Sequence, residues 1–309
     1  MAKEIRVFAP ASIGNVACGF DVIGISIVGP GDEVVVRPTR KKGVHIVSIT
    51  GVEGLPMEAE KNTAGLAALK LLEHLGEKRG VEMEIHKRMP IGSGLGSSAA
   101  SAVAGAYSVN ALLGFPLSTK ELLPFAGTGE ALASGAIHLD NIAPSLLGGM
   151  TLVRSNKEFD VVHIPTPTDL YATVVHPNIK LLTKDSRAVI PLRIPLKSAI
   201  AQWGNVGGLI AGMMLSDWGL IGRSLQDVVI EPHRARFIPG FYEVKGAAMY
   251  AGALGASISG AGPSVFALTK GEETAKKAAA AMQKIFGEKG IMSEAYVSPI
   301  SSDIRVKVI

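Results

Sequence analysis

The chain has 309 residues, of which 47% are hydrophobic, 19% charged and only 5% aromatic, with a formal net charge of +4. This length allows one large or two ordinary domains, with a core built from aliphatic and small side chains. No run of five like charges and no basic stripe with interleaved aromatic residues occurs, which argues against nucleic-acid binding. The mild positive excess is better explained by attraction of small anionic substrates.

Cys18 is the only cysteine, which excludes an intrachain disulfide and is typical of a reducing compartment. Charges interrupt the apolar residues at the N-terminus, so it reads as a strand and not as a signal peptide. The least polar stretch, residues 91–117, is broken by Gly, Ser and Asn and indicates small-residue packing, not a membrane span. We therefore expect a cytoplasmic protein that binds neither membrane nor nucleic acid.

Hydrophobic periodicity predicts a mixture of strands and helices along the whole chain. In the N-terminal half, strands are expected at 3–9, 32–37, 44–50, 81–86 and 150–154, and helices at 62–75, 97–113 and after the capping box at 118–121. In the C-terminal half, strands are expected at 170–176, 265–268 and 304–308, and helices at 195–215, 239–254 and 274–286.

The pattern changes beyond Arg154, which places a domain boundary near residues 154–160. We expect an α+β N-terminal domain at 1–155 and an α+β C-terminal domain at 156–309. Strands and helices do not alternate strictly, so a doubly wound parallel sheet is not expected.

A glycine-rich segment lies between a predicted strand and a predicted helix. Gly92, Gly94 and Gly96 stand at alternate positions and are followed by Ser97 and Ser98. Glycine permits positive φ and lets backbone N–H groups approach a ligand closely, and the helix N-terminus adds unsatisfied N–H groups. The two serines can cap the helix or present hydroxyls to a phosphate or metal. The segment predicts a cradle for a nucleoside triphosphate.

This loop is neither of the two common phosphate-binding motifs. A P-loop needs Lys-Ser or Lys-Thr after its last glycine, but no charged residue occurs from Met89 to Thr119. The dinucleotide motif needs an acidic residue about 20 positions later, but the first one downstream is Glu121. A loop without its own cation must neutralise phosphate charge with N–H dipoles and a magnesium ion. The alternative is a glycine turn that merely lets a helix pack closely.

Three glycine-bearing segments, at 10–21, 90–101 and 255–264, stand far apart in the chain. The pattern P-x-G-x-G-L-G-S-S-A-A in the middle one resembles the second signature of the GHMP kinases, and the three segments follow the motif order of that superfamily. The local sequences P-A-S-x-x-N-x-x-x-G-F-D, H-x-D-N-x-A-P-S-L-x-G-G, S-R-A-x-x-P and E-P-x-R-A-x-x-I-P-G-F resemble the homoserine kinases within it. The resemblance covers nearly the whole chain.

The resemblance implies a two-domain GHMP kinase fold, an N-terminal α+β domain with a left-handed crossover joined to a ferredoxin-like C-terminal domain, and a homodimer. It implies transfer of a phosphoryl group from ATP to L-homoserine, with Mg²⁺ held by Ser98 and Glu130. Asn62 is expected to help at the nucleotide. From bare sequence, Glu130 could equally be a solvated helix residue. The remaining residues assigned to the nucleotide are Pro90, Ile91, Gly92, Ser93, Gly94, Leu95, Gly96, Ser97, Ser98, Ala99 and Ala100.

The acceptor residues follow from the same resemblance. Asn15 is expected beside the substrate hydroxyl and Asp21 beside the α-ammonium, and an Asx-turn is the alternative for both. Arg187 and Arg234 are expected to bind the carboxylate through their planar guanidinium groups, and ordinary surface salt bridges are the alternative. The residues expected to complete this pocket are Thr183 and Gly260.

His138 and Asn141 belong to a segment that lines the active site in homoserine kinases. Asn141 stands where mevalonate-type relatives carry a catalytic aspartate, and a neutral amide cannot act as a general base. We therefore expect the acceptor hydroxyl to attack directly. No histidine shows ligand spacing for zinc, and Cys18 is expected to be a buried bystander.

Two alternatives to a homoserine kinase stay open. Another GHMP kinase, of the mevalonate or diphosphocytidyl-methylerythritol type, would act on an isoprenoid precursor that has no ammonium for Asp21 to pair with. A catalytically silent ligand-binding relative would not need Ser97, Ser98 and Glu130, all of which are present.

Overall fold

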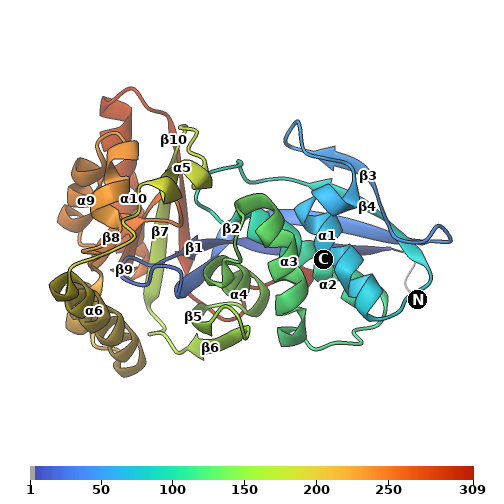
Figure 1. Cartoon of the computed structure of the whole chain (residues 1–309). Helices are drawn as coiled ribbons and strands as arrows, with labels where there is room; N and C mark the ends of the chain where they lie inside the picture. Colours follow the sequence, from blue (N-terminus) through green and yellow to red (C-terminus); the bar gives the residue numbers. More distant parts are fainter. Residues whose placement is uncertain (1–3) are drawn as a thin grey trace.

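The computed structural model describes residues 4–309, which form two α+β units around two sheets (Figure 1). The strands of the first sheet are β1 (Ile5–Gly14), β2 (Ile23–Thr39), β3 (Val44–Thr50), β4 (Gly80–His86), β5 (Met150–Ser155), β6 (Asp160–Ile164) and β11 (Lys307–Val308). Their order is β11-β1-β2-β4-β3, with β5 paired to β2 and β6 to β5. Only the β3–β4 pair is parallel, so the sheet is not doubly wound.

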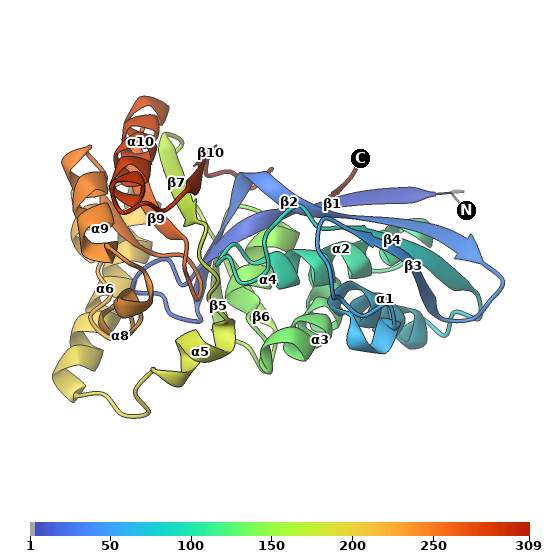
Figure 2. The same cartoon turned by 90° about the horizontal axis from the view of Figure 1, so that it is seen from above.

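Helices cover one face of this sheet, as Figure 2 shows from above. They are α1 (Thr63–His74), α2 (Ser97–Leu112), α3 (Leu123–Ser134) and α4 (Leu139–Leu147), with the short 3₁₀ turns η1 (Ala59–Lys61) and η2 (Lys120–Leu122) before α1 and α3. α1 lies in the connection between the parallel strands β3 and β4; the left-handed sense of this crossover stays a prediction.

α2 is the central helix of the N-terminal unit and is buried on almost every side. It contacts α1, α3, α4, β1 and β2 at once. Its small residues make this possible, since a Cβ at Gly105 would collide with the carbonyl oxygen of Ala64 in α1. A helix that is apolar all round is expected only where it is enclosed, so the small-residue run of the sequence marks the core and not a membrane span.

The second sheet is antiparallel, with the strand order β10-β7-β9-β8. Its strands are β7 (Leu170–Pro177), β8 (Gly255–Ile258), β9 (Val265–Lys270) and β10 (Ser293–Pro299), and it packs against α9 (Phe241–Tyr250) and α10 (Glu272–Glu288). This order, with one helix after the first strand and one after the third, is ferredoxin-like as predicted. Inserted after β7 are α5 (Thr183–Ala188), α6 (Leu196–Leu215), α7 (Trp218–Ser224), α8 (Glu231–Arg234) and η3 (Ala235–Phe237).

The chain passes from the first sheet to the second between Ile164 and Leu170, later than the boundary predicted at residue 155. That position falls between β5 and β6, which pair with each other. The C-terminal strand β11 then returns to the first sheet and pairs with β1, through Val308 opposite Val7. Composition could not reveal either feature, because both depend on which strands pair.

Other differences have local causes. The sequence did not predict α4, because Pro144 inside it interrupts the helical pattern. The short strands β6, β8 and β10 were also missed, and β2 is longer than predicted because it continues through Pro30. Within residues 4–309, no helix has the length and apolar character needed to cross a membrane.

Candidate active site

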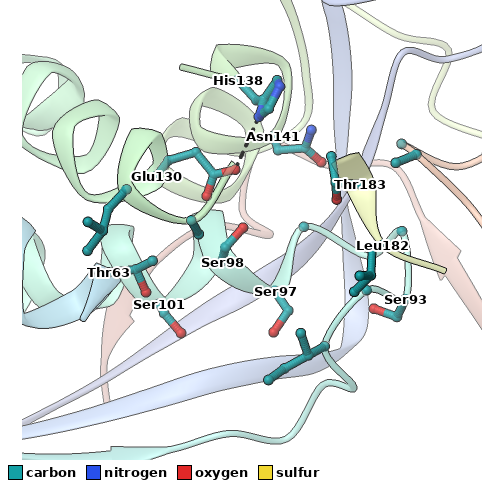
Figure 3. A pocket seen from close by; sticks show the side chains of 18 of the residues that line it. Thr63, Ser93, Ser97, Ser98, Ser101, Glu130, His138, Asn141, Leu182 and Thr183 are labelled. Carbon is teal, nitrogen blue, oxygen red and sulfur yellow. Dashed lines mark hydrogen bonds and ion pairs between the residues drawn. The ribbon is translucent and has the colours of Figure 1, made fainter. Parts of the chain in front are cut away.

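A pocket of about 450 Å³ opens between the N-terminal helices, α5 and the third glycine-bearing segment (Figure 3). The predicted site residues that line it are Asn15, Asp21, Asn62, Ile91, Gly92, Ser93, Gly94, Gly96, Ser97, Ser98, Glu130, His138, Asn141, Thr183, Arg187, Arg234 and Gly260. Four predicted residues do not line it, since Leu95, Ala99 and Ala100 are fully buried and Pro90 is exposed outside it. Segments far apart in the chain thus share one pocket.

Hydrogen bonds join the three glycine-bearing segments directly. The Ser259 hydroxyl donates to the carbonyl oxygen of Gly94 at 2.7 Å, and the Gly260 N–H donates to the carbonyl oxygen of Gly14 at 3.1 Å. The Asn15 side-chain amide donates to the carbonyl oxygen of Gly260 at 2.7 Å. The glycine-rich loop at residues 92–98 therefore has a fixed position relative to the other two glycine-bearing segments.

Gly94 and Gly96 are required for two reasons. Both have positive φ, 78° and 68°, where a Cβ is disfavoured. A Cβ at Gly94 would come within 2.5 Å of the carbonyl oxygen of Ser259, and one at Gly96 would collide with the Ser12 hydroxyl. Gly96 is also the N-cap of α2 and has no side chain to cap it, so the N–H groups of the first turn are left for a ligand.

Oppositely charged side chains lie together in the part of the pocket lined by Asp21, Arg187 and Arg234. Arg187 donates to a carboxylate oxygen of Asp21 at 2.6 Å, and both side chains are about one third exposed. The ring of Phe20 lies 5.4 Å from the Arg187 guanidinium carbon and 5.1 Å from that of Arg234, a cation–π arrangement. Phe20 was not predicted, although it lies directly before Asp21 in the motif.

Arg234 is buried, with 3% of its surface exposed, which rules out a surface salt bridge. Its guanidinium donates to the carbonyl oxygens of Ser186 at 3.2 Å and Gly260 at 3.0 Å. Burial and the neighbouring charge of Arg187 lower the pKa of Arg234 to about 10, so it keeps its charge at neutral pH. Its remaining N–H groups are suited to an anion in the pocket.

The loop after β1 is strained. Asn15, Val16 and Ala17 have φ of 71°, 42° and 59°, and Asp21 has φ of 57°. Each left-handed residue other than glycine costs roughly 1–2 kcal/mol, and such strain clusters at functional sites. The Asn15 side-chain oxygen accepts from the Asp21 N–H at 2.9 Å. This bond spans six residues and closes the loop at the pocket wall, so it is not the local Asx-turn that was the alternative for Asn15.

Asp140 was not predicted as a site residue, although it precedes Asn141 in the motif. One carboxylate oxygen accepts from the Asn15 N–H at 3.2 Å and from the Asn141 side chain at 3.1 Å. The other is buried and has no hydrogen-bond partner within residues 4–309. Burial, together with the negative charge of Asp21, raises the pKa of Asp140 to about 6. The Asn141 oxygen accepts from the Ser12 hydroxyl at 3.0 Å, so its amide is held at both ends.

Glu130 and Ser98 project from α3 and α2 into the same part of the pocket (Figure 3). Glu130 hydrogen-bonds His138 at 3.2 Å. Burial lowers the pKa of His138, but the Glu130 hydrogen bond and the Asp140 charge outweigh it, so the pKa is raised. A hydroxyl and a carboxylate fit Mg²⁺, which is usually held by one or two carboxylates together with substrate phosphates. Among the described residues, no cluster of three or more His, Cys, Asp or Glu forms a metal site by itself.

The remaining part of the pocket is more apolar and contains Leu55, Ile85 and Leu132. Asn62 lies there as the N-cap of α1, and its side-chain oxygen accepts from two N–H groups of the first turn at 3.1 and 3.2 Å. The amide of Asn62 therefore shapes the wall. Cys18 is buried, as predicted, and burial raises the pKa of its thiol to about 12.

Two family models match the chain. That of the GHMP kinases N terminal domain matches residues 62–149, and that of the GHMP kinases C terminal matches residues 209–288. The homoserine kinase of Chlorobium phaeovibrioides is 49% identical over 311 residues, which span 96% of this chain and 97% of that relative. The chain belongs to the homoserine kinases of the GHMP kinase family.

Solved structures agree with this membership. The crystal structure of homoserine kinase from Cytophaga hutchinsonii matches with a TM-score of 0.98 and 55% identity, covering 100% of this chain and 98% of that chain. L. major mevalonate kinase in complex with R-mevalonate matches with a TM-score of 0.71 at 16% identity and shares the fold alone, over 97% of each chain. The GHMP fold and the kinase class predicted from the sequence are confirmed, and the protein transfers phosphate to a hydroxyl group.

Asp140→Asn is expected to stabilise the kinase at pH 7.5 but not at pH 4.5. Between its ordinary pKa of 3.8 and about 6, the folded protein keeps a proton on Asp140 that the unfolded chain has lost. Stability therefore falls as pH rises through this window, by up to roughly 3 kcal/mol, and stays lower above it. Thermal melts at both pH values measure the difference, and the exposed Asp185→Asn serves as control. An equal rise in melting temperature at the two pH values would contradict the raised pKa of Asp140.

Proposed function

We propose that this kinase transfers the γ-phosphoryl group of ATP to the side-chain hydroxyl of L-homoserine, on the threonine branch of amino-acid synthesis. The observation that carries the proposal is the ion pair of Asp21 with Arg187 beside the buried Arg234. A zwitterionic amino acid has an ammonium for Asp21 and a carboxylate for both arginines. Binding would exchange one protein ion pair for a set of charge-assisted hydrogen bonds.

An isoprenoid acceptor fits this charge set less well. Mevalonate could offer a carboxylate to Arg187 and Arg234, but it has no cation for Asp21. The carboxylate of Asp21 would then be left facing an anionic substrate, which costs binding energy. The identity of the acceptor thus depends on Asp21 more than on the two arginines.

The opposite end of the pocket suits the nucleotide. The N–H groups of the Gly92–Ser98 loop and of the first turn of α2 would bind phosphate oxygens, and the apolar part near Leu55 and Ile85 would take the base. Ser98 and Glu130 would hold Mg²⁺, which supplies charge neutralisation on the phosphates when bound. Thr183 lies on α5 at the same pocket and would complete the acceptor end.

The reaction needs no side-chain base. The acceptor oxygen attacks the γ-phosphorus, the bond to the β–γ bridging oxygen breaks and ADP leaves. The hydroxyl proton departs late, to a phosphate oxygen or water, which a loose transition state tolerates. Asn141 orients the acceptor through an amide that Ser12 and Asp140 hold in place. Positioning of this kind accounts for several kcal/mol of a barrier.

ADP release measured side by side with L-homoserine, mevalonate, galactose and no acceptor tests the function. We expect release above the no-acceptor rate only with L-homoserine. A preference for mevalonate would assign the chain to another GHMP activity. Binding of ADP without turnover of any acceptor would identify a catalytically silent relative.

Arg234→Lys is expected to raise the KM for L-homoserine about 10- to 100-fold and to leave ATP binding unchanged. Lysine keeps the charge but loses the planar fork, and a charge-assisted hydrogen bond contributes about 1.5–3 kcal/mol. The matched control is Arg236→Lys, an exposed arginine two positions away. Unchanged homoserine kinetics in Arg234→Lys would remove this arginine from the acceptor site.

We also propose that the kinase is a cytoplasmic homodimer. Support comes from a run of exposed large apolar side chains before and along α6, namely Leu192, Ile194, Leu196, Ile200 and Trp203. Large apolar side chains exposed close together in the chain favour an interface there. Light scattering should give twice the chain mass of 32.2 kDa, and a monomer at micromolar concentration would contradict the dimer.

Recovery of the native protein in a membrane or secreted fraction would contradict the proposed cytoplasmic location.

A further inference from the structure

A buried cation, the ammonium of Lys87, lies beside the glycine-rich loop, which has no charged residue of its own. Lys87 follows β4 directly, and its side chain is 4% exposed. Its ammonium forms an ion pair with Asp32 of β2, whose side chain is 0% exposed. The two residues are 55 positions apart. Lys87 also contributes to the wall of the pocket.

The ammonium of Lys87 is connected to the first turn of α2. It donates to the carbonyl oxygen of Ser97 at 3.0 Å, to the Ser97 hydroxyl at 2.5 Å and to the Ser101 hydroxyl at 2.8 Å. Ser101 in turn donates to Asp32 at 2.7 Å. The N–H group of Arg88 donates to the other carboxylate oxygen of Asp32 at 3.2 Å. An ammonium has three donors, and all of them are engaged.

These bonds give Ser97 and Ser98 different partners. Figure 3 shows Ser97 and Ser101 pointing to one side of α2, whereas Ser98 points toward Glu130 on the other. Lys87 holds the hydroxyl of Ser97, so that only Ser98 offers its hydroxyl at the position where Mg²⁺ and phosphate are expected. The carbonyl bond to Ser97 also fixes the peptide planes whose N–H groups begin the helix.

We propose that Lys87 is a positioning residue for the nucleotide. It sets the first turn of α2 for phosphate binding, and Asp32 holds its ammonium there. The proposal rests on the proposed function, in which this loop binds ATP. Acceptor binding does not depend on it, because within residues 4–309 the hydrogen bonds of Asp21, Arg187 and Arg234 go to other groups than Lys87 and Asp32.

Stability alone does not account for the pair. Two charges lose their hydration on burial, and an apolar pair of similar volume is often as stable or more stable. Removal of only one partner, by contrast, leaves an uncompensated buried charge and is strongly destabilising. A test must therefore change both residues together.

The experiment compares wild type with the double variant Lys87→Met/Asp32→Leu. We expect the melting temperature to stay close to that of wild type. The dissociation constant for MgADP and the KM for ATP should each rise about tenfold or more, whereas the KM for L-homoserine should stay within twofold of wild type. The magnitude corresponds to the loss of hydrogen bonds from a charged donor. The control Lys70→Met/Glu73→Leu removes an exposed ion pair of α1 and should change none of these values.

A second double variant, Lys87→Gln/Asp32→Asn, keeps polar groups without charge and carries the test if the first does not fold. Its MgADP affinity should lie between wild type and the fully apolar pair. A folded variant of either kind that binds MgADP within twofold of wild type would overturn the proposal, as would an equal rise in both KM values. Failure of the wild-type chain to bind MgADP would instead refute the proposed function.

Discussion

The carbonyl oxygen of Gly260 is the contact on which the active site depends. It accepts from Asn15, which comes from the N-terminal unit, and from Arg234, which comes from the C-terminal unit. Next to it, Ser259 holds the glycine-rich loop at residues 92–98 through Gly94. One short loop thus fixes Asn15, Arg234 and the glycine-rich loop, the groups proposed to bind the two substrates, relative to each other. In a reaction that depends on placing two substrates, this shared support matters more than any single reactive side chain.

The packing of α2 serves the same purpose. Its small residues let α1, α3, α4, β1 and β2 approach closely, so the helix has no room to shift, and its N-terminus is where the phosphates are expected. The cost is a tight core in which a single added methyl group, as at Gly105, meets backbone. Rigidity at the loop is thereby obtained from aliphatic packing and not from cross-links, since Cys18 is the only cysteine.

Features that depend on local backbone chemistry could be predicted from the sequence, and features that depend on long-range pairing could not. Gly94 and Gly96 need positive φ, and that requirement is visible in the order of residues. The ion pair of Lys87 with Asp32 joins the residue after β4 to a residue of β2, and nothing local to either indicates the other. Asp140 was passed over because Pro144 hides the helix that turns it into the pocket. The roles of individual site residues stay predictions.

The return of the chain end to the first sheet has a consequence for biosynthesis. β11 pairs with β1 at Val7 and Phe8, so residues 307 and 308 form the last strand at this edge of the N-terminal sheet. During translation, β1 emerges first and must wait for the whole C-terminal unit before its outer edge is covered. An uncovered strand edge is a template for intermolecular pairing. This part of the β1 edge therefore stays open to intermolecular pairing until residues 307 and 308 have been made, and chaperones that shield sheet edges would act up to that stage.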